Sequence, residues 1–487
     1  MASTAKPAHR TVEERRTRGR EARVRTPLSR HRGWAPAVDR ADQVALLQEQ
    51  DATREPDLVP VRHGRMMISP FTFYRGAAKV MAADLARTPT AGLHVQLCGD
   101  AYLSNFGLFA SPERRLLFDL NDFDETLPGP FEYDVKRMAA SFTIAGRNNG
   151  FTKGDTRAAT LASVAAYREA MARFATMGTM EIWYAHLGED KLPRALRDAA
   201  ADASTTRKGA KAAKRAQKTA RREAAKARTR DSLQALSKLA ELVSGQYRII
   251  SRPPIVVPAR DLEATYGVSR DKMERLFGEQ FRAYRATLRD DHRHLLERFE
   301  PVDVARKVVG VGSVGTLAYI VLLQGRDQDD PLFLQLKEAT ASVLEDHLPK
   351  SRYRHHGQRV VCGQRVVCGQ RMMQAASDIY LGWTEARIPT VHHFYWRQLR
   401  DMKGSPDIET MAPATLGFYA RACGWTLARA HARSGDPIAI AAYLGEGDQF
   451  DRSTIDFSER YADQNERDHR AFVKAVRSGR LRALEGL

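Results

Sequence analysis

The feature that most limits the fold of this chain is an acidic motif spread over two neighbouring stretches. The first stretch, CGDAYLSNFG, carries Asp100 and, five positions later, Asn105. The second, FDLNDFDE, is an apolar strand that ends in Asp122-Phe123-Asp124. Carboxylate and amide oxygens are the hard ligands that Mg²⁺ prefers. The alternative is that these are ordinary turn residues, since Asp, Asn and Gly concentrate in loops for conformational reasons alone.

The order of these residues resembles the order in which kinase-type phosphotransferases carry their catalytic base and metal ligands. On this hypothesis Asp100 is the base that accepts the proton of the incoming hydroxyl group. Asn105 and Asp122 hold Mg²⁺, and Asp124 is an additional ligand. A D-x-x-x-x-N spacing is common by chance, but it is much less so when FDLNDFDE follows it.

A glycine-rich stretch, VVGVGSVGTLAYIVLLQ, places Gly310, Gly312 and Gly315 between two strand-like runs. In a dinucleotide-binding fold these glycines would open a helix, whereas here they open a strand. A glycine-rich turn between two strands is typical of the kinase loop that covers the phosphates of ATP. The alternative is a tight hairpin that binds nothing.

Lys337 ends the next strand-like run, LFLQLKEA, where a kinase carries the lysine that grips the α- and β-phosphates. A carboxylate partner for this lysine is expected nearby. Glu345 and Glu338 are the two candidates, and the sequence does not separate them.

Length and charge limit the class of protein. A chain of 487 residues is too long for one ordinary core and predicts two or more lobes. The net charge of +18 favours polyanionic partners such as nucleotides, nucleic acid or acidic surfaces. Four cysteines without metal-binding spacing predict a reducing, cytoplasmic location. No apolar run approaches the roughly 20 residues that span a bilayer.

Two basic segments carry little apolar periodicity. Residues 1–39 are predicted to be a disordered or loosely docked arm, because such a composition buries too little surface to offset the ordering entropy. Residues 201–230 are rich in Ala, Lys and Arg and predict a solvated helix or a mobile insertion. Nonspecific binding of nucleic acid is the alternative for both segments.

Other polar residues near these motifs have predicted roles. Arg62, Arg65 and Arg75 lie just before the Asp100 stretch, where guanidinium groups could face phosphates. Asp134 opens a helix after the second stretch, and the kinase-like resemblance implies that it braces the Asp100 loop from beneath. His431 lies on the apolar face of a late helix and is interpreted as a packed or capping residue.

Several longer segments together resemble the bacterial family called domain of unknown function 2252, from about residue 40 to the end of the chain. GDAYLSNF, NDFDE and YDVKRMA are more distantly similar to aminoglycoside and choline phosphotransferases. Cys98 stands where that pattern has His, and Tyr102 where it often has His. The segments that carry the family resemblance are LVPVRHGRMMISPFTFYRG, CGDAYLSNFG, FDLNDFDETLPGPFEYDVKRMAASF, VVGVGSVGT and YADQNERDHRAF.

The order of the motifs is unusual for a kinase, because the glycines and Lys337 follow Asp100 instead of preceding it. We therefore expect an α+β, protein-kinase-like, two-lobed fold that is circularly permuted, which is tolerated where chain ends lie together at the surface. Residues 40–300 would form a mainly helical large lobe and residues 301–405 a small β-rich nucleotide lobe. Residues 406–487 would be helices that complete the large lobe.

The predicted function is an ATP-dependent phosphotransferase, or an enzyme that transfers another part of the nucleotide. The cofactors are ATP and Mg²⁺, and the acceptor is an unidentified small molecule or protein. Gly310, Gly312, Gly315 and Lys337 would hold the triphosphate. The alternatives are a nucleotide-binding pseudokinase or scaffold, and a basic protein that binds nucleic acid.

Overall fold

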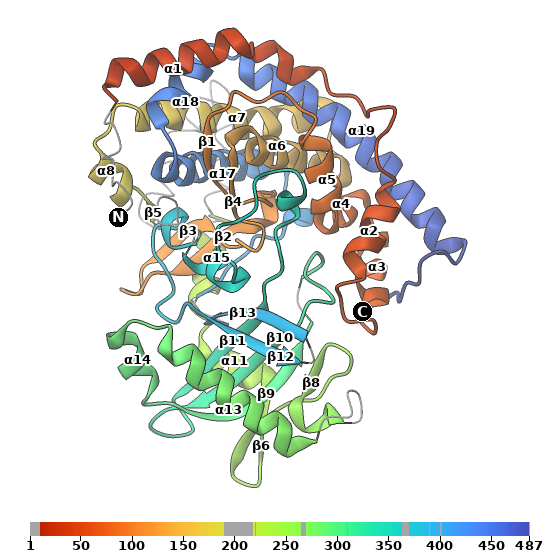
Figure 1. Cartoon of the computed structure of the whole chain (residues 1–487), viewed down its shortest axis with the longest axis vertical. Helices are drawn as coiled ribbons and strands as arrows, with labels where there is room; N and C mark the ends of the chain where they lie inside the picture. Colours follow the sequence, from red (N-terminus) through yellow and green to blue (C-terminus); the bar gives the residue numbers. More distant parts are fainter. Residues whose placement is uncertain are drawn as a thin grey trace, which may run out of the picture.

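The computed structural model describes residues 10–188, 218–219, 221–263, 269–308, 310–362, 370–388, 390–399 and 402–486. Helices gather in the upper part of the view in Figure 1, and a six-stranded sheet lies in the lower part. Most helices and the largest sheet thus lie in different regions, although small sheets accompany the helices and a few helices pack on the large sheet. This arrangement confirms the α+β class.

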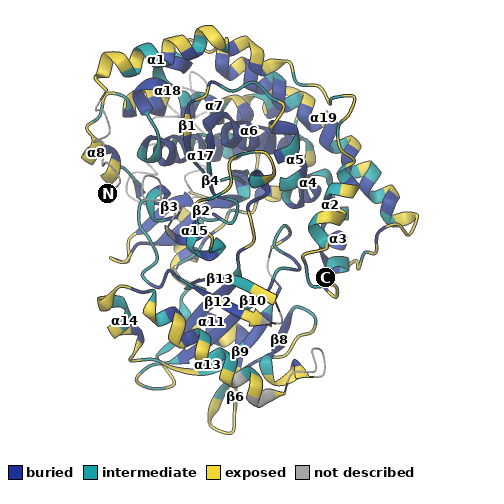
Figure 2. Cartoon of the chain, viewed as in Figure 1, coloured by how far each residue is buried: buried dark blue, intermediate teal, exposed yellow. Residues whose placement is uncertain are grey.

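The core of the helical part consists of α6, α7 and α17, each of which buries one face or more in Figure 2. Helix α6 is covered on nearly every side, since all but its last two residues are buried. Helix α17 lies against α7 although the two are far apart in the chain, and α19 covers α6. The bounds are α6 Phe131–Asn148, α7 Lys153–Phe174, α17 Pro413–Ser434 and α19 Gln449–Arg477.

The described part of the N-terminal segment, for which a disordered or loosely docked arm was predicted over residues 1–39, contains a helix that packs on a distant helix. Helix α1 (Val12–Arg25) packs on α18 (Pro437–Leu444). A Cβ atom on Gly19 would lie only 2.2 Å from the carbonyl oxygen of Ala439, so the two backbones approach closely. The Arg23 guanidinium donates to the carbonyl oxygens of Ala442 and Tyr443. These contacts with distant residues hold a helix that has no apolar stripe of its own.

Short helices and small sheets connect α1 to the core. Strand β1 pairs with β4, and β3 pairs with β2 and β5, all antiparallel. The connecting elements are η1 Leu28–Arg32, α2 Gln43–Asp51, α3 Val59–Met67, α4 Pro70–Gly76, α5 Ala78–Leu85, β1 His94–Leu97, η2 Leu103–Asn105, β2 Phe106–Ala110, β3 Leu116–Leu120 and β4 Leu127–Pro130. After α7 the chain forms α8 Thr179–Tyr184 and β5 Leu187–Gly188.

The large sheet is antiparallel throughout, in the order β12-β13-β11-β10-β9-β8. Three consecutive strands, β9, β10 and β11, lie side by side, and β13 pairs with the far side of β11. Lys337 on β11 is opposite Ala318 on one neighbour and Tyr395 on the other. The bounds are β8 Val256–Pro258, β9 Glu300–Lys307, β10 Ala318–Gln324, β11 Pro331–Glu338, β12 Gly382–Ile388 and β13 Thr390–Gln398.

The sheet region begins earlier in the chain than predicted. Residues from about 231 pack on the sheet, whereas the predicted boundary lay at residue 301. Tyr284 stacks on Trp396 of β13, with ring centroids 4.4 Å apart, and Leu236 belongs to one apolar cluster with Phe333 of β11. The elements concerned are α11 Ser232–Leu239, β6 Ala240–Val243, β7 Gln246–Ile249, η3 Ala259–Asp261, α13 Arg270–Ala286 and α14 Asp290–Leu296. Their apolar stripes fit a helical bundle equally well, so the sequence did not assign them to the sheet.

Between β11 and α17 the chain returns to the helical part through η4 Val343–Asp346, α15 His356–Cys362, α16 Gln370–Met373 and η5 Ile408–Thr410. Most of the basic insertion predicted at 201–230 lies outside the described residues. None of the helices in the described ranges combines the length and the apolar character required to cross a bilayer.

Candidate active site

The loop that carries Asp100 is held from below by Asp134, as predicted. Its two carboxylate oxygens accept hydrogen bonds from the backbone N–H of Cys98 (2.6 Å) and of Gly99 (3.0 Å). Gly99 has φ +85°, and a Cβ atom there would lie 2.1 Å from the carbonyl oxygen of Glu125. The loop therefore requires glycine both for its backbone conformation and for its close approach to the second stretch.

His431 supports Asp134 and has no direct place in the site. Its Nε2 lies 3.2 Å from Asp134 Oδ2, and its Nδ1 lies 2.8 Å from the Tyr167 hydroxyl oxygen. All three side chains are buried. This agrees with the interpretation of His431 as a packed residue.

Asp100 is held by two neighbours that contact different oxygen atoms of the residue. Arg137 Nε donates to Asp100 Oδ1 (2.8 Å), and the Asn105 amide donates to the Asp100 carbonyl oxygen (2.8 Å) and approaches Oδ2 (3.4 Å). The Asp100 side chain is still 20% exposed. Burial raises its pKa above the ordinary aspartate value, Arg137 opposes this shift, and Asp122 adds to it.

Two contacts join the Asp100 loop to the second stretch. The Cys98 thiol donates to the carbonyl oxygen of Asp122 (3.0 Å), and Asn121 N–H donates to the carbonyl oxygen of Asn105 (2.8 Å). Burial raises the pKa of Cys98 well above its ordinary value, so the thiol keeps its proton and remains a donor. Cys98 thus connects the two stretches through a hydrogen bond.

Asp124 receives the side chain of Lys337, which joins the sheet to the second stretch. The Lys337 side chain is only 3% exposed, and its ammonium group forms an ion pair with Asp124 Oδ2. The Tyr395 hydroxyl donates to Asp124 Oδ1 (2.7 Å), and Asp124 N–H donates to Asp122 Oδ1 (3.2 Å).

The surrounding charges shift the pKa values of Asp122 and Asp124 in opposite directions. Burial alone would raise the pKa of Asp124, but Lys337 and Tyr395 lower it below the usual range. Burial and the neighbouring Asp124 instead raise the pKa of Asp122, although Lys337 opposes them. The structure brings Lys337 to the Asp122-Phe123-Asp124 motif, although the lysine lies 213 residues after Asp124 in the sequence.

Glu345, one of the two predicted partners of Lys337, lies elsewhere. It belongs to the short helix η4, where its side chain caps the backbone N–H of Ser342. Glu338 accepts a hydrogen bond from Leu317 N–H (3.0 Å) and contacts His392. Both glutamates satisfy local backbone or side-chain groups, and Asp124 takes the lysine instead.

Arg359 of α15 was not singled out from the sequence. It is buried and donates to three carbonyl oxygens, those of Asp124 (2.7 Å), Thr126 (2.8 Å) and Thr340 (2.8 Å). Its position in a repeated GQRVVC segment gave no hint of this role. The tandem copy, which continues through residues 363–369, lies outside the described residues.

Tyr395 and Arg397 on β13 were also missed. They lie beside Lys337 and its neighbour on β11, and Arg397 donates to Gln335 Oε1 (2.9 Å) and approaches the carbonyl oxygen of Asn121 (3.4 Å). The alternating pattern of HHFYWRQ placed both residues on one face of a strand. Only the pairing of β13 with β11 placed that face against the acidic residues.

The glycine-rich turn lies against the helical part. Gly310 (φ +68°) and Gly315 (φ +92°) adopt conformations that favour glycine. Arg65 donates to the Gly310 carbonyl oxygen (2.6 Å), and Glu55 N–H donates to that of Gly315 (2.7 Å). A Cβ atom on Gly312 would lie 3.0 Å from the Arg75 carbonyl oxygen.

The three arginines predicted to face phosphates have different environments. Arg75 Nε lies 3.3 Å from the Tyr102 hydroxyl oxygen, so it connects the glycine-rich turn to the Asp100 loop. Arg65 contacts the glycine-rich turn itself. Arg62 is fully buried and bound to Asp51, which places it in the core.

The donor set is suited to Mg²⁺. In the described parts of the chain, no group of three or more His, Cys, Asp or Glu side chains has the arrangement of a metal site. Mg²⁺ on a nucleotide, however, commonly uses one or two carboxylates together with phosphate oxygens and water. Asp122 and Asp124 supply carboxylates of that kind two residues apart, and a backbone hydrogen bond from Asn121 to Asn105 joins them to the stretch that carries the Asn105 amide.

The fold and this cluster define an α+β protein with a polar site where the loops of its helical part meet an antiparallel sheet. The chain belongs to the bacterial family DUF2252, described as "Uncharacterized protein conserved in bacteria", whose model matches residues 54–475. This match confirms the family resemblance. Neither the curated proteins nor the solved structures include a significant match to the chain.

Proposed function

We propose that this protein is an ATP-dependent phosphotransferase with a circularly permuted, protein-kinase-like fold. The observation that carries the proposal is the ion pair between Lys337 of β11 and Asp124, beside Asp122 and the Asp100 loop. A lysine on the third strand beside metal-binding carboxylates is the arrangement that kinases use to hold the phosphates of ATP.

The order of the strands supports the same proposal. The glycine-rich turn joins β9 to β10, and Lys337 follows on β11, as in a kinase nucleotide lobe. The sheet region lies in the chain between the helices α6 and α7 and the helix α17, which pack together. A permuted chain, in which the nucleotide lobe interrupts the large lobe, accounts for this order.

The mechanism assigns each side chain a step. Asp100 accepts the proton of the acceptor hydroxyl, and Arg137 and Asn105 hold its carboxylate in position. Asn105, Asp122 and Asp124 would hold Mg²⁺, which neutralises the charge that develops on the phosphate oxygens. Lys337 exchanges its bond with Asp124 for phosphate oxygens when nucleotide binds.

A thermal shift with ATP and Mg²⁺ tests the proposal, because a ligand that binds only the native state raises its melting temperature. We expect a Mg²⁺-dependent rise in the wild type that is lost in Lys337→Ala and in Asp122→Ala. The exposed residues Lys238 and Asp290 provide the matched controls Lys238→Ala and Asp290→Ala, which should keep the rise. No rise in the wild type at millimolar nucleotide would contradict the proposal.

A nucleotide-binding scaffold is the competing candidate, because Arg137 already occupies one carboxylate oxygen of Asp100. Asp100→Asn separates the two functions. An enzyme should lose acceptor phosphorylation in this variant and keep its ATP-dependent thermal shift. A scaffold would show the shift and no turnover in either form. Under both hypotheses we propose a cytoplasmic location, because the buried Cys98 and Cys423 are free thiols and a reducing compartment keeps them so.

A further inference from the structure

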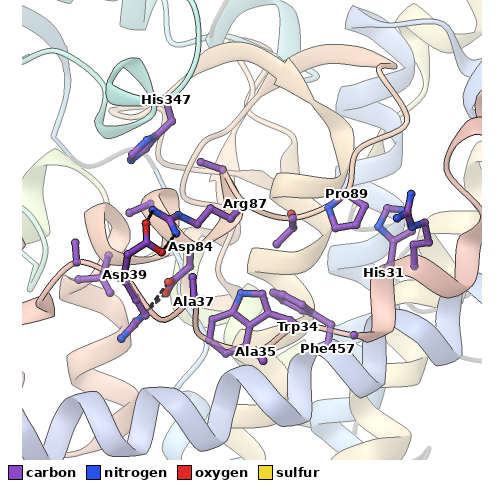
Figure 3. Close-up of a pocket in the computed structure, with 18 of the residues that line it drawn as sticks. His31, Trp34, Ala35, Ala37, Asp39, Asp84, Arg87, Pro89, His347 and Phe457 are labelled. Carbon is purple, nitrogen blue, oxygen red and sulfur yellow. Dashed lines mark hydrogen bonds and ion pairs between the residues drawn. The ribbon is translucent and has the colours of Figure 1, made fainter.

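A pocket of about 350 Å³ lies apart from the candidate active site, between residues 30–41, α5 and the residue that follows η4. Figure 3 shows Trp34 and Phe457 along one side, Arg87 and His347 along the other, and His31 at one end beside Pro89. Its volume is at the lower end of the range for small-molecule sites. A ligand that fills it would be small and would contact an aromatic wall.

Among the described side chains that line the pocket, two of the arginines are already in ion pairs. Arg40 is held by Asp84 (2.7 Å) and by Asp468 (2.7 Å), and Arg87 by Asp39, so carboxylates already neutralise both guanidinium groups. Arg30 also lines the pocket, is exposed, and forms no ion pair with any residue in the described ranges. An anionic ligand would therefore bind Arg30 without breaking an existing ion pair.

His31 presents a hydrogen-bond acceptor without a partner. The Tyr443 hydroxyl donates its only proton to the carbonyl oxygen of Thr26 (2.9 Å), so at 2.7 Å it accepts from His31 Nε2. Nδ1 then carries a lone pair, and no donor among the described residues reaches it. The His31 side chain is 1% exposed. A buried acceptor of this kind calls for a donor from a ligand or from water.

A buried lysine adds positive potential behind the same end of the pocket. The Lys136 ammonium donates to the carbonyl oxygen of Pro89 (3.4 Å) and lies 5.3 Å from the centre of the Phe457 ring. Burial lowers the pKa of Lys136 to about 8, and Glu132 opposes this shift. Burial, with a contribution from Lys136, lowers the pKa of His31 to about 3, so His31 is neutral at physiological pH.

We propose that this pocket binds a small planar anion that carries a hydrogen-bond donor, such as a hydroxylated aromatic carboxylate or phosphate. The aromatic ring packs on Trp34, the anionic group binds the Arg30 side, and the donor reaches His31 Nδ1. This site is separate from the nucleotide site and does not depend on the proposed phosphotransfer.

Isothermal titration of the full chain with 4-hydroxybenzoate tests the proposal. We expect binding that is at least about tenfold tighter than that of the neutral 4-hydroxybenzamide, because a charge-assisted bond is lost with the amide. 4-Hydroxyphenyl phosphate distinguishes a carboxylate from a phosphate ligand. Arg30→Gln should weaken binding of the preferred anion by a similar factor.

Arg32→Gln is the matched control for Arg30→Gln. Arg32 belongs to the same short helix, is exposed, and does not line the pocket. The preferred anion should bind this variant like the wild type, and saturating ATP should not displace it. Equal affinity for the anion and the amide, equal effects of the two arginine variants, or no binding of either anion would overturn the proposal.

Discussion

At the scale of single residues, Glu125 is a buried carboxyl group whose protonation differs between the folded protein and the unfolded chain. Its Oε2 accepts a hydrogen bond from Val343 N–H (2.7 Å), and its carbonyl oxygen accepts one from the Ser342 hydroxyl (2.8 Å). Burial raises the pKa of Glu125 to about 7, although Val343 and Arg359 oppose this shift. The folded protein therefore keeps a proton on Glu125 that the unfolded chain loses above its ordinary pKa.

Because Glu125 keeps this proton in the folded state, we expect the free energy of unfolding to depend on pH in a way that Glu125→Gln removes. Between pH 4.5 and about 7 the folded state binds more protons at this site than the unfolded state, so rising pH lowers the free energy of unfolding. The wild type should lose at most about 3 kcal/mol relative to Glu125→Gln across this window.

Urea denaturation of both proteins at pH 5 and pH 8 measures this difference. The other titrating groups, including Glu132, are the same in the two proteins and cancel. A difference in unfolding free energy that does not change with pH would show that Glu125 has an ordinary pKa.

Residue types with local signals were recognised from the sequence, and those without were not. Asp134 opens a helix directly after the second stretch, and its bracing role was expected from the kinase-like interpretation of that stretch. Arg359, Tyr395 and Arg397 lie far along the chain, and nothing near them marks a site. Their function depends on which strand or loop they face, which only tertiary packing decides.

At the scale of elements, α15 connects the sheet region to the acidic stretch. Its Arg359 binds the carbonyl oxygens of Asp124 and Thr126, and its guanidinium lies 3.8 Å from Glu345 of η4. A single side chain thus fixes the backbone on both sides of Glu125. The position of α15 should control the geometry of Asp124.

Arg359→Met tests this role. The change keeps much of the side-chain volume but leaves buried carbonyl oxygens without donors, so the free energy of unfolding should fall by about 3 kcal/mol or more. The rise in melting temperature with ATP and Mg²⁺ should also shrink.

Chemical denaturation and the thermal shift measure the two effects of Arg359→Met. The exposed Arg354 provides a control, since Arg354→Met should leave both quantities unchanged. A fully retained nucleotide response in Arg359→Met would show that α15 does not position Asp124.

At the scale of the whole molecule, segments from both ends of the chain complete the helical part. Helix α1 packs on α18, and α17 packs on α7. The Arg15 guanidinium binds Asp436 (2.9 Å) just before α18. A helix without an apolar stripe becomes stable here because a distant helix offers it carbonyl and carboxylate acceptors.

Removal of residues 1–24 should therefore destabilise the whole fold. The deletion removes the close contact of Gly19 with α18 and leaves the carbonyl oxygens that Arg23 binds without that donor. We expect a loss of about 2 kcal/mol or more in the free energy of unfolding, measured by urea denaturation. Removal of residues 1–9 alone is the control and should have little effect. Equal stability of both truncated proteins would contradict a docked α1.

The sequence by itself determined the local features of this protein. Apolar spacing predicted the strands on either side of the glycine-rich turn, and the D-x-x-x-x-N and Asp-Phe-Asp patterns identified the acidic residues. Each of these patterns spans only a few residues, so local spacing in the sequence is enough to recognise it.

The tertiary structure decided which distant groups meet. Asp124 rather than Glu345 took Lys337, because Glu345 caps the turn of η4 whereas the pairing of β11 and β13 directs Lys337 and Tyr395 to the second stretch. The boundary near residue 231 and the docking of α1 were decided in the same way. The sequence of an amphipathic or basic helix does not identify the surface that will cover it, since any partner of suitable shape and charge can pack against it.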